Sequence, residues 1–390
     1  MRILLPSIVD PWRHSGGAGA ATRGLVSLLR RPPLAAEVDV VVPSSGLPHV
    51  VRQIVALTRS SVSAWPSKAL FLDTSRFRHA VARAVAARRY DLVLINGGDL
   101  LWMLPRLPAD VPKVLYAHNL EQDLFASQLE ALPAALRWAR GRLRRDLRKL
   151  ARYELDGMRA VGRVLFISAA DETRVRTAAP GLRTLHVPPL FEYEPSPRPG
   201  RTRSDGTPEL GFLANFTWWP NRAALRWLVH DVLPSVRRDL RLHLFGEGSE
   251  RLDVGDPRMV VHGFVDDVAK VFACCDVMLC PIVSGAGVSI KFAEALYNGV
   301  PVLATSFAAR GLPLPAAAGV AIADGVDEWV RLLDGERLVA LAAEKVPATT
   351  SRVFAPATHA SAVHDFLLAA VAGTGDAARN APEPRCAPSR

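Results

Sequence analysis

The chain has 390 residues, which is too long for one ordinary domain, so two domains are expected. Its hydrophobic content of 49% and charged content of 22% are those of a soluble globular protein. No apolar run approaches the ~18 residues of a membrane span, and the run before Pro6 is too short for a signal peptide. The chain is therefore expected to stay in the cytoplasm.

The net charge of +10 is unevenly distributed along the chain. Residues 1–190 hold 28 Lys and Arg against 15 Asp and Glu, whereas the remainder holds 20 against 23. This asymmetry suggests that the first half faces an anionic partner, either nucleic acid or a membrane surface. The four cysteines include no C-x-x-C pair, which favours buried free thiols in a reducing compartment.

Short apolar runs alternate with helical patterns through the first half. The runs that predict strands are RILL at 2–5, VDVVVP at 38–43, DLVLI at 91–95, KVLYAHN at 113–119, RVLFIS at 163–168 and RTLHVP at 183–188. The Gly-rich loop HSGGAGA, at 14–20, is followed by a helical pattern at 21–29; another helical pattern lies at 76–89, and a strongly basic helix comes later. Strands separated by helices imply parallel βαβ units and a doubly wound sheet.

A second alternating series begins after a segment rich in Pro, Gly and charge. Its predicted strands are ELGFLAN at 209–215, LRLHLFG at 240–246, MVVHGF at 259–264, VMLCP at 277–281 and GVAIA at 319–323. The sequence thus predicts an α/β fold of two doubly wound, Rossmann-like domains facing a central cleft. The predicted boundaries are a first domain at 1–190, a linker at 191–208, a second domain at 209–355, a helix at 356–372 that can return to the first domain, and a disordered tail at 373–390.

The window SGAGVSIKFAEALYNGVPVLAT, at 284–305, follows the buried strand VMLCP. Gly285 and Gly287 let backbone N–H groups approach a ligand, and the helix that follows directs its positive end at the same spot. Lys291 adds a cation that suits phosphate, and Glu294, three residues on, shares its helix face. A carboxylate can accept hydrogen bonds from a vicinal diol such as ribose, so the pair fits a nucleotide. The alternative is an ion pair on a solvated helix.

This window resembles the late motif of the group 1 glycosyltransferases (glycosyltransferase family 4), which have the GT-B fold. Glu294 and Ala295 match the second half of their Glu-x7-Glu element, and NGVPVLAT and SFAARGL match the strand and loop that follow it. FLANFTWWPNR, LHLFGEG and VVHGFVDDVAKVFACC look like earlier parts of the same domain, and HSGG, YAHNLE and FISAAD like the acceptor-side domain. The first Glu of the element falls at Ala286, so that carboxylate is missing.

The resemblance implies a set of site residues. His118, which ends a predicted strand, would contact the donor sugar, and Lys291 and Glu294 complete the predicted catalytic group. A lone His there can also be a hydrogen-bonded core residue, and Gly16 and Gly17 can form a tight turn without a ligand. The residues predicted to bind the nucleotide sugar are Gly16, Gly17, Asn221, Arg222, Gly246, Phe264, Ser284, Gly285, Ala286, Gly287, Val288, Lys291 and Glu294.

No D-x-D or H-E-x-x-H stands in the sequence, so neither a metal site nor a cofactor is predicted. The segment from Arg137 to Arg152 holds eight basic residues and one acidic residue, with leucines interleaved. It predicts a basic helix that docks on anionic lipid through Arg144, Arg145, Arg148 and Lys149. The alternative is a solvated arginine face over packed leucines; no nucleic-acid-binding module is evident.

Taken together, the sequence predicts a glycosyltransferase, peripheral on the inner face of the membrane. It would move a sugar from a nucleotide diphosphate sugar to a hydroxyl acceptor, such as a lipid-linked saccharide, with retention and without metal, in polysaccharide or glycolipid assembly. Two alternatives stay open. One is a nucleotide-sugar epimerase on the same fold, and the other is a catalytically degenerate scaffold, which the missing carboxylate at Ala286 would allow.

Overall fold

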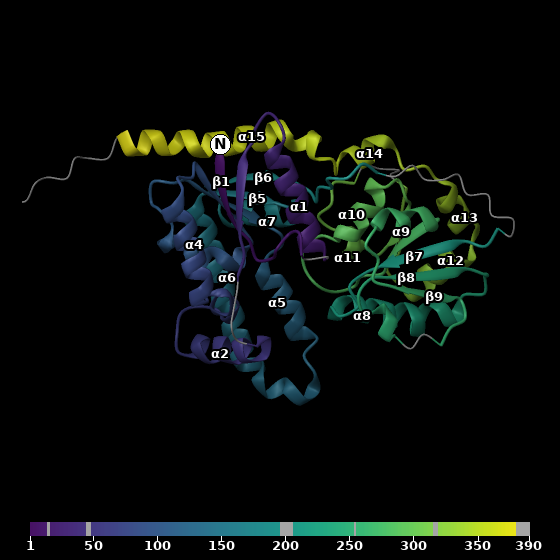
Figure 1. Cartoon of the computed structure of the whole chain (residues 1–390). Helices are drawn as coiled ribbons and strands as arrows, with labels where there is room; N and C mark the ends of the chain where they lie inside the picture. The colour runs from purple at the N-terminus through teal and green to yellow at the C-terminus, as the bar shows by residue number, and fades with distance from the viewer. Residues whose placement is uncertain (14–15, 44–47, 196–205, 253–254, 315–318, 380–390) are drawn as a thin grey trace, which may run out of the picture.

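The computed structural model describes residues 1–13, 16–43, 48–195, 206–252, 255–314 and 319–379. Within these residues the chain forms two domains side by side, each built on a parallel six-stranded sheet with helices on its faces (Figure 1). The predicted fold class, two doubly wound α/β domains, is confirmed.

The first sheet has the strand order β2-β1-β3-β4-β5-β6. Its strands are β1 (Arg2–Pro6), β2 (Glu37–Val41), β3 (Leu92–Asn96), β4 (Lys113–Ala117), β5 (Arg163–Phe166) and β6 (Arg183–His186). All five residues of β3 are buried, as expected for a parallel strand covered on both faces. The direction of winding reverses between β1 and β3, and ligands of such sheets bind beyond the strand ends at this point.

The second sheet has the order β12-β11-β10-β7-β8-β9, so its winding reverses between β7 and β10. Its strands are β7 (Glu209–Leu213), β8 (Arg241–Phe245), β9 (Met259–Gly263), β10 (Val277–Cys280), β11 (Val302–Ala304) and β12 (Val320–Ile322). The loop after β10 is the Gly-rich window found in the sequence. The topology therefore places that window where a ligand is expected.

The helices of the first domain are α1 (Gly17–Arg30), α2 (His49–Ser61), α3 (Ser67–Leu72), α4 (Ser75–Ala87), α5 (Glu121–Glu130), α6 (Arg140–Val161) and α7 (Ala169–Ala178). Those that follow are α8 (Trp219–Trp227), α9 (Val268–Cys274), α10 (Ile290–Tyr297), α11 (Ser306–Ala309), α12 (Val326–Asp334), α13 (Glu336–Ala343), α14 (Ala348–Arg352) and α15 (Pro356–Arg379). Several begin at a side-chain cap; Thr74, Ser168, Asp267 and Ser289 each accept from a backbone N–H of the first turn. The sequence patterns did not predict α2 and α3.

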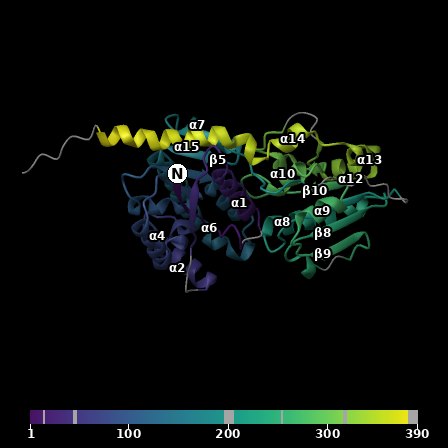
Figure 2. The same ribbon diagram turned by 45° about the horizontal axis from the view of Figure 1, so that its top comes forward.

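The chain crosses between the domains twice. At the first crossing, inside the predicted linker, Phe191 is buried in the second domain's core and its N–H donates to the carbonyl of Phe354 at 3.1 Å. The beginning of the linker is therefore packed, because its aromatic residues fill that core; residues 196–205 lie outside the described part. At the second crossing α15 lies along the first domain, as both views show (Figures 1 and 2), and buries Val363 and Leu367 against α1.

The predicted disordered tail begins too early. The helix α15 continues through residues 373–379, although two of these seven residues are glycines, which have a low helix propensity. Residues 380–390 of the predicted tail lie outside the described part of the chain.

Candidate active site

The loop between β10 and α10 reaches across to the first domain. Gly285 and Gly287 have φ of +121° and +70°, a region that favours glycine. The N–H of Gly285 donates to Ser127 Oγ on α5 at 3.1 Å. A Cβ on Gly287 would lie only 3.0 Å from the Cβ of Asn119 and 3.1 Å from the carbonyl oxygen of His118. The loop can therefore approach the end of β4 only because it lacks side chains at these points.

The helix α10 starts at the end of this loop. Ser289 is its N-cap, with Oγ accepting from the N–H of Phe292 at 3.4 Å. Ser284, Ala286 and Val288, which the sequence also assigns to the site, lie in the same loop and are partly exposed, and Val288 packs on the first domain's core. The positive end of α10 and the loop N–H groups thus lie together between the domains, an arrangement suited to an anion.

Lys291 and Glu294 lie side by side on α10, as the spacing predicts. Lys291 Nζ is 2.9 Å from Glu294 Oε2, and the hydroxyl of Tyr193 donates to Glu294 Oε1 at 3.2 Å. Glu294 is only 3% exposed, so both carboxylate oxygens are engaged inside the protein. The ion pair that the sequence left as an alternative therefore exists, although it is buried at Glu294 instead of solvated. The predicted roles of the two residues toward phosphate and ribose stay predictions.

His118 lies just beyond β4 and is held by Asn96 at the end of β3. Asn96 Oδ1 is 2.5 Å from His118 Nε2, and Asn96 Nδ2 donates to Ser7 Oγ at 2.8 Å and to Thr22 Oγ1 at 2.9 Å. Burial lowers the pKa of His118 to about 4, so its imidazole is neutral at pH 7. This network joins β1, α1, β3 and β4 at the point where the winding of the first sheet reverses.

Gly17 belongs to the contact between the domains. A Cβ there would come within 3.0 Å of Ile290 Cγ1, at the start of α10, and Gly16 is the N-cap residue of α1. The N-terminal ends of α1 and α10, each preceded by glycines, thus face each other. Gly16 and Gly17 were predicted to bind the nucleotide sugar, and the structure places Gly17 beside Ile290 at the start of α10.

The remaining predicted residues lie at the start of α8 and in the loops after β8 and β9 of the second domain. Asn221 Nδ2 donates to the carbonyl of Asn215 at 2.8 Å, and Arg222 Nη1 donates to that of Thr217 at 3.0 Å. Gly246, with φ of +119°, has no room for a side chain, because a Cβ would lie 2.0 Å from the carbonyl oxygen of Ala214. Phe264 is 54% exposed after β9 and leaves a free aromatic face.

Arg310 lies at the site but was not predicted from the sequence. It follows α11, its Nε donates to the carbonyl of Gly287 at 3.2 Å, and its guanidinium lies over the ring of Phe307. Burial lowers the pKa of Arg310, which Asp171 partly offsets. The only signal in the sequence was its place in the SFAARGL loop after a strand end. It is a second cation beside the Gly-rich loop, in addition to Lys291.

Three unpaired buried polar atoms add to this region. Asn119 Nδ2 and Trp219 Nε1 have no hydrogen-bond partner, and neither does Asp171 Oδ2 at the start of α7. Asn119 touches Gly287, and Trp219 begins α8, whose Pro220 lies 3.9 Å from a Cβ built on Gly285. Buried polar groups of this kind normally pair with an ordered water, an ion or a ligand, so these three atoms can take such a partner.

The basic helix α6 differs from the prediction at one residue. Arg144, Arg145 and Arg148 are exposed, but Lys149 Nζ donates to the carbonyls of Ser60 and Ser63, the latter at 2.7 Å. Lys149 is thus occupied within the protein, because its ammonium group satisfies carbonyls at the C-terminal end of α2; the membrane contact of all four residues stays a prediction. No helix in the described ranges combines the length and the apolar composition needed to cross a bilayer.

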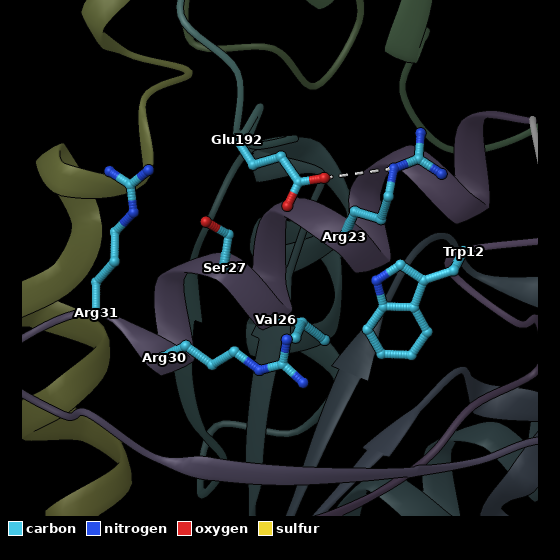
Figure 3. A pocket seen from close by; sticks show the side chains of 7 residues that line it. All are labelled: Trp12, Arg23, Val26, Ser27, Arg30, Arg31 and Glu192. Atoms are coloured by element: carbon cyan, nitrogen blue, oxygen red, sulfur yellow. Dashed lines mark ion pairs between the residues drawn. The ribbon is translucent and has the colours of Figure 1, made fainter. Parts of the chain in front are cut away.

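A separate cavity of about 230 Å³ lies beside α1 (Figure 3). Arg23 Nε and Glu192 Oε1 are 3.7 Å apart within it. None of its lining residues belongs to the predicted site. They are Trp12, Arg23, Val26, Ser27, Arg30, Arg31 and Glu192.

Comparisons with known proteins agree with this arrangement. Residues 15–188 match a family described as Glycosyltransferase Family 4, and residues 207–334 match one described as Glycosyl transferases group 1. No curated protein matches the chain. HepE from Anabaena in complex with UDP is similar, at 17% identity and a TM-score of 0.58, over 95% of this chain and 100% of that one.

Other solved structures share the architecture. Sucrose-phosphate synthase from Thermosynechococcus elongatus is similar at 15% identity and a TM-score of 0.61, over 97% of this chain and 98% of that one. The lipopolysaccharide outer core galactosyltransferase WaaB, in its apo form, is similar at 11% identity and a TM-score of 0.51, over 95% and 99%. The two matched families, together with this two-domain architecture, show that the chain belongs to the group 1, family 4 glycosyltransferases of the GT-B fold.

Proposed function

We propose that this glycosyltransferase takes its sugar from a nucleoside diphosphate sugar bound between the domains. The observation that carries the proposal is the Gly-rich loop and the start of α10, with Lys291 beside them and Arg310 bonded to the carbonyl of Gly287. Backbone N–H groups and two cations suit a diphosphate, whose charge grows as it departs. UDP is the first nucleotide to test, because the similar HepE is a complex with UDP.

The reaction that we propose retains the configuration of the sugar. The bond from the anomeric carbon to the diphosphate oxygen breaks, a bond to the acceptor oxygen forms, and the acceptor proton leaves on the diphosphate. The chain's own residues would position the reactants: Glu294 at the ribose, His118 at the sugar, and Lys291 and Arg310 at the diphosphate. Neither a metal ion nor a cofactor is part of this proposal.

For the acceptor we propose a hydroxyl on a lipid-linked saccharide, with a role in polysaccharide or glycolipid assembly. The support is the exposed arginines of α6, Arg144, Arg145 and Arg148, which suit an anionic membrane surface. The protein would then work as a peripheral membrane enzyme.

A binding screen tests the donor class directly. UDP, GDP and ADP, each alone and as the glucose conjugate, are added to the full chain, and the rise in melting temperature is measured. We expect stabilisation by UDP and by a UDP-sugar. A wild-type chain that none of the ligands stabilises, and that releases no nucleoside diphosphate from any donor, would favour the scaffold alternative.

A further inference from the structure

The helix α2 turns an apolar stripe toward solvent. Val50 is 64% exposed, Ile54 is 60% exposed, and Val62, just after the helix, is 90% exposed. Val51 and Val55 are exposed on the same side, whereas Ala56 and Ser60 on the opposite side are buried. An exposed apolar patch of this size is unusual on a globular surface and indicates a contact with a partner.

The turn between α5 and α6 adds to this stripe. Trp138 in this turn is 82% exposed, and Leu136 is exposed beside it. Arg142 Nη2 donates to the carbonyl of Leu57, so the start of α6 is fixed against α2. In Figure 1 α2 and the α5–α6 turn lie at the same end of the first domain. We call this the α2 surface; it consists of Val50, Val51, Ile54, Val55, Val62, Leu136 and Trp138.

The charged residues of the two segments that form the α2 surface have one sign. Residues 49–62 and 131–145 contain no Asp or Glu. They contain several arginines, namely Arg52, Arg59, Arg137, Arg140, Arg142, Arg144 and Arg145. A partner for this surface must therefore be apolar and anionic at once. A second copy of the chain would bring one arginine-rich surface against another, which is unfavourable.

We propose that the α2 surface docks on an anionic bilayer, with α2 lying in the headgroup layer and its valines and Ile54 entering the acyl boundary. An amphipathic helix with a basic rim binds in this way, and tryptophan is favoured at the same depth. This inference rests on the membrane association proposed above and names the element that inserts. It adds an apolar contact that salt does not screen to the electrostatic contact of the arginines.

Docking at this surface would place the bilayer on the side of the first domain that carries the candidate active site. The loop after β2 leads into α2, and the loop after β4, which holds His118, leads into α5. Both helices therefore follow the carboxyl ends of the strands, the side on which His118 and Asn96 lie. A lipid-linked acceptor could then reach the site while its lipid remains in the bilayer.

The test uses the full chain and vesicles of phosphatidylcholine, with and without phosphatidylglycerol, in co-sedimentation at low and high salt. Wild type should bind the anionic vesicles and keep part of this binding at high salt. Ile54→Asp should lower the partition coefficient by about tenfold or more, since a charge is costly in the acyl boundary. Val339→Asp, an exposed valine on α13 of the second domain, is the matched control and should bind like wild type.

Three outcomes overturn the proposal: equal partition of wild type and Ile54→Asp, complete release of wild type by salt, or no binding to either vesicle. Self-association that Ile54→Asp abolishes, without vesicle binding, would assign the surface to a second copy instead. Binding of UDP is titrated in every variant. Vesicle binding without UDP binding would contradict the proposed donor and leave the docking proposal intact. UDP binding without vesicle binding would contradict the docking and leave the proposed donor intact.

Discussion

The amide oxygen of Asn96 lies 2.5 Å from Nε2 of His118, and the surrounding hydrogen bonds determine which partner holds the proton. Ser7 Oγ donates to the carbonyl of Val9, and Thr22 Oγ1 donates to that of Ala18, so both hydroxyls can only accept from Asn96 Nδ2. Asn96 Oδ1 must then face His118, whose Nε2 carries the hydrogen. In the neutral ring Nδ1 then carries no hydrogen and can accept a hydrogen bond.

Asn96→Asp should raise the pKa of His118 from its value of about 4, because a carboxylate beside Nε2 stabilises the imidazolium. The titration of the ring, followed by NMR, measures this directly. Turnover should fall by roughly tenfold, since a protonated ring cannot accept a hydrogen bond from the substrate. Thr22→Val removes one bond to Asn96 without adding charge and should leave the pKa low. A His118 resonance that shifts identically in wild type and Asn96→Asp would contradict the role of Asn96.

Lys291→Ala and Arg310→Ala should each lower turnover by about tenfold or more, because the charge of the leaving diphosphate grows in the transition state. Lys291→Arg keeps a cation and should restore part of the rate. Because Lys291→Ala also leaves Glu294 buried without its cation, melting temperatures are measured alongside steady-state kinetics. Unchanged turnover in a stable Lys291→Ala protein would contradict the proposed contact between Lys291 and the diphosphate.

Glu294→Gln should weaken binding of UDP and of a UDP-sugar alike, by about tenfold, if the carboxylate accepts from the ribose hydroxyls. If it touches the transferred sugar instead, only the sugar nucleotide should bind more weakly. Calorimetric titrations with both ligands separate these results. Tyr193→Phe is the control, because it removes the other protein donor to Glu294 and keeps the charge. If Glu294→Gln binds both ligands as tightly as the wild type does, neither the ribose role nor the sugar role of Glu294 holds.

Glu154 should make the fold less stable as pH rises. It caps the start of α5, accepting from the N–H groups of Glu121 at 2.7 Å and Gln122 at 2.8 Å, and burial raises its pKa to about 8. Between the ordinary pKa of a glutamate and this value, the folded chain holds a proton that the unfolded chain releases. The free energy of unfolding should therefore decrease from about pH 5 to about pH 8.

Glu154→Gln should flatten this slope, as measured by denaturant unfolding at both ends of the window. Glu130→Gln, at an exposed residue of α5, the helix that Glu154 of α6 caps, should leave the slope unchanged. A Glu154→Gln protein with the full wild-type slope would show that other groups cause the dependence; Asp99, whose pKa burial raises to about 7, would be the next to replace.

The sequence by itself determined the two parallel sheets and the site's main loop. Parallel strands buried on both faces are short apolar runs, such as VMLC of β10, and the helices between them have their own period, so each element is encoded locally. The pairing of Lys291 with Glu294 was also local, because a helix brings residues three apart onto one face. The motif in this window, in combination with those of the other second-domain loops, was enough to predict the family, since each is a local feature of the sequence.

The tertiary structure alone decided which distant groups meet. Asn96 bonds to His118 from another strand, Arg310 reaches Gly287 from another loop, and Tyr193 in the predicted linker bonds to Glu294. Periodicity says nothing about such partners. Periodicity likewise predicted an exposed ammonium group for Lys149, and it did not predict that the valines of α2 are exposed to solvent. Both depend on how α2 packs on α6, and burial is set by the neighbours that folding brings together, not by the residues that precede and follow in the chain.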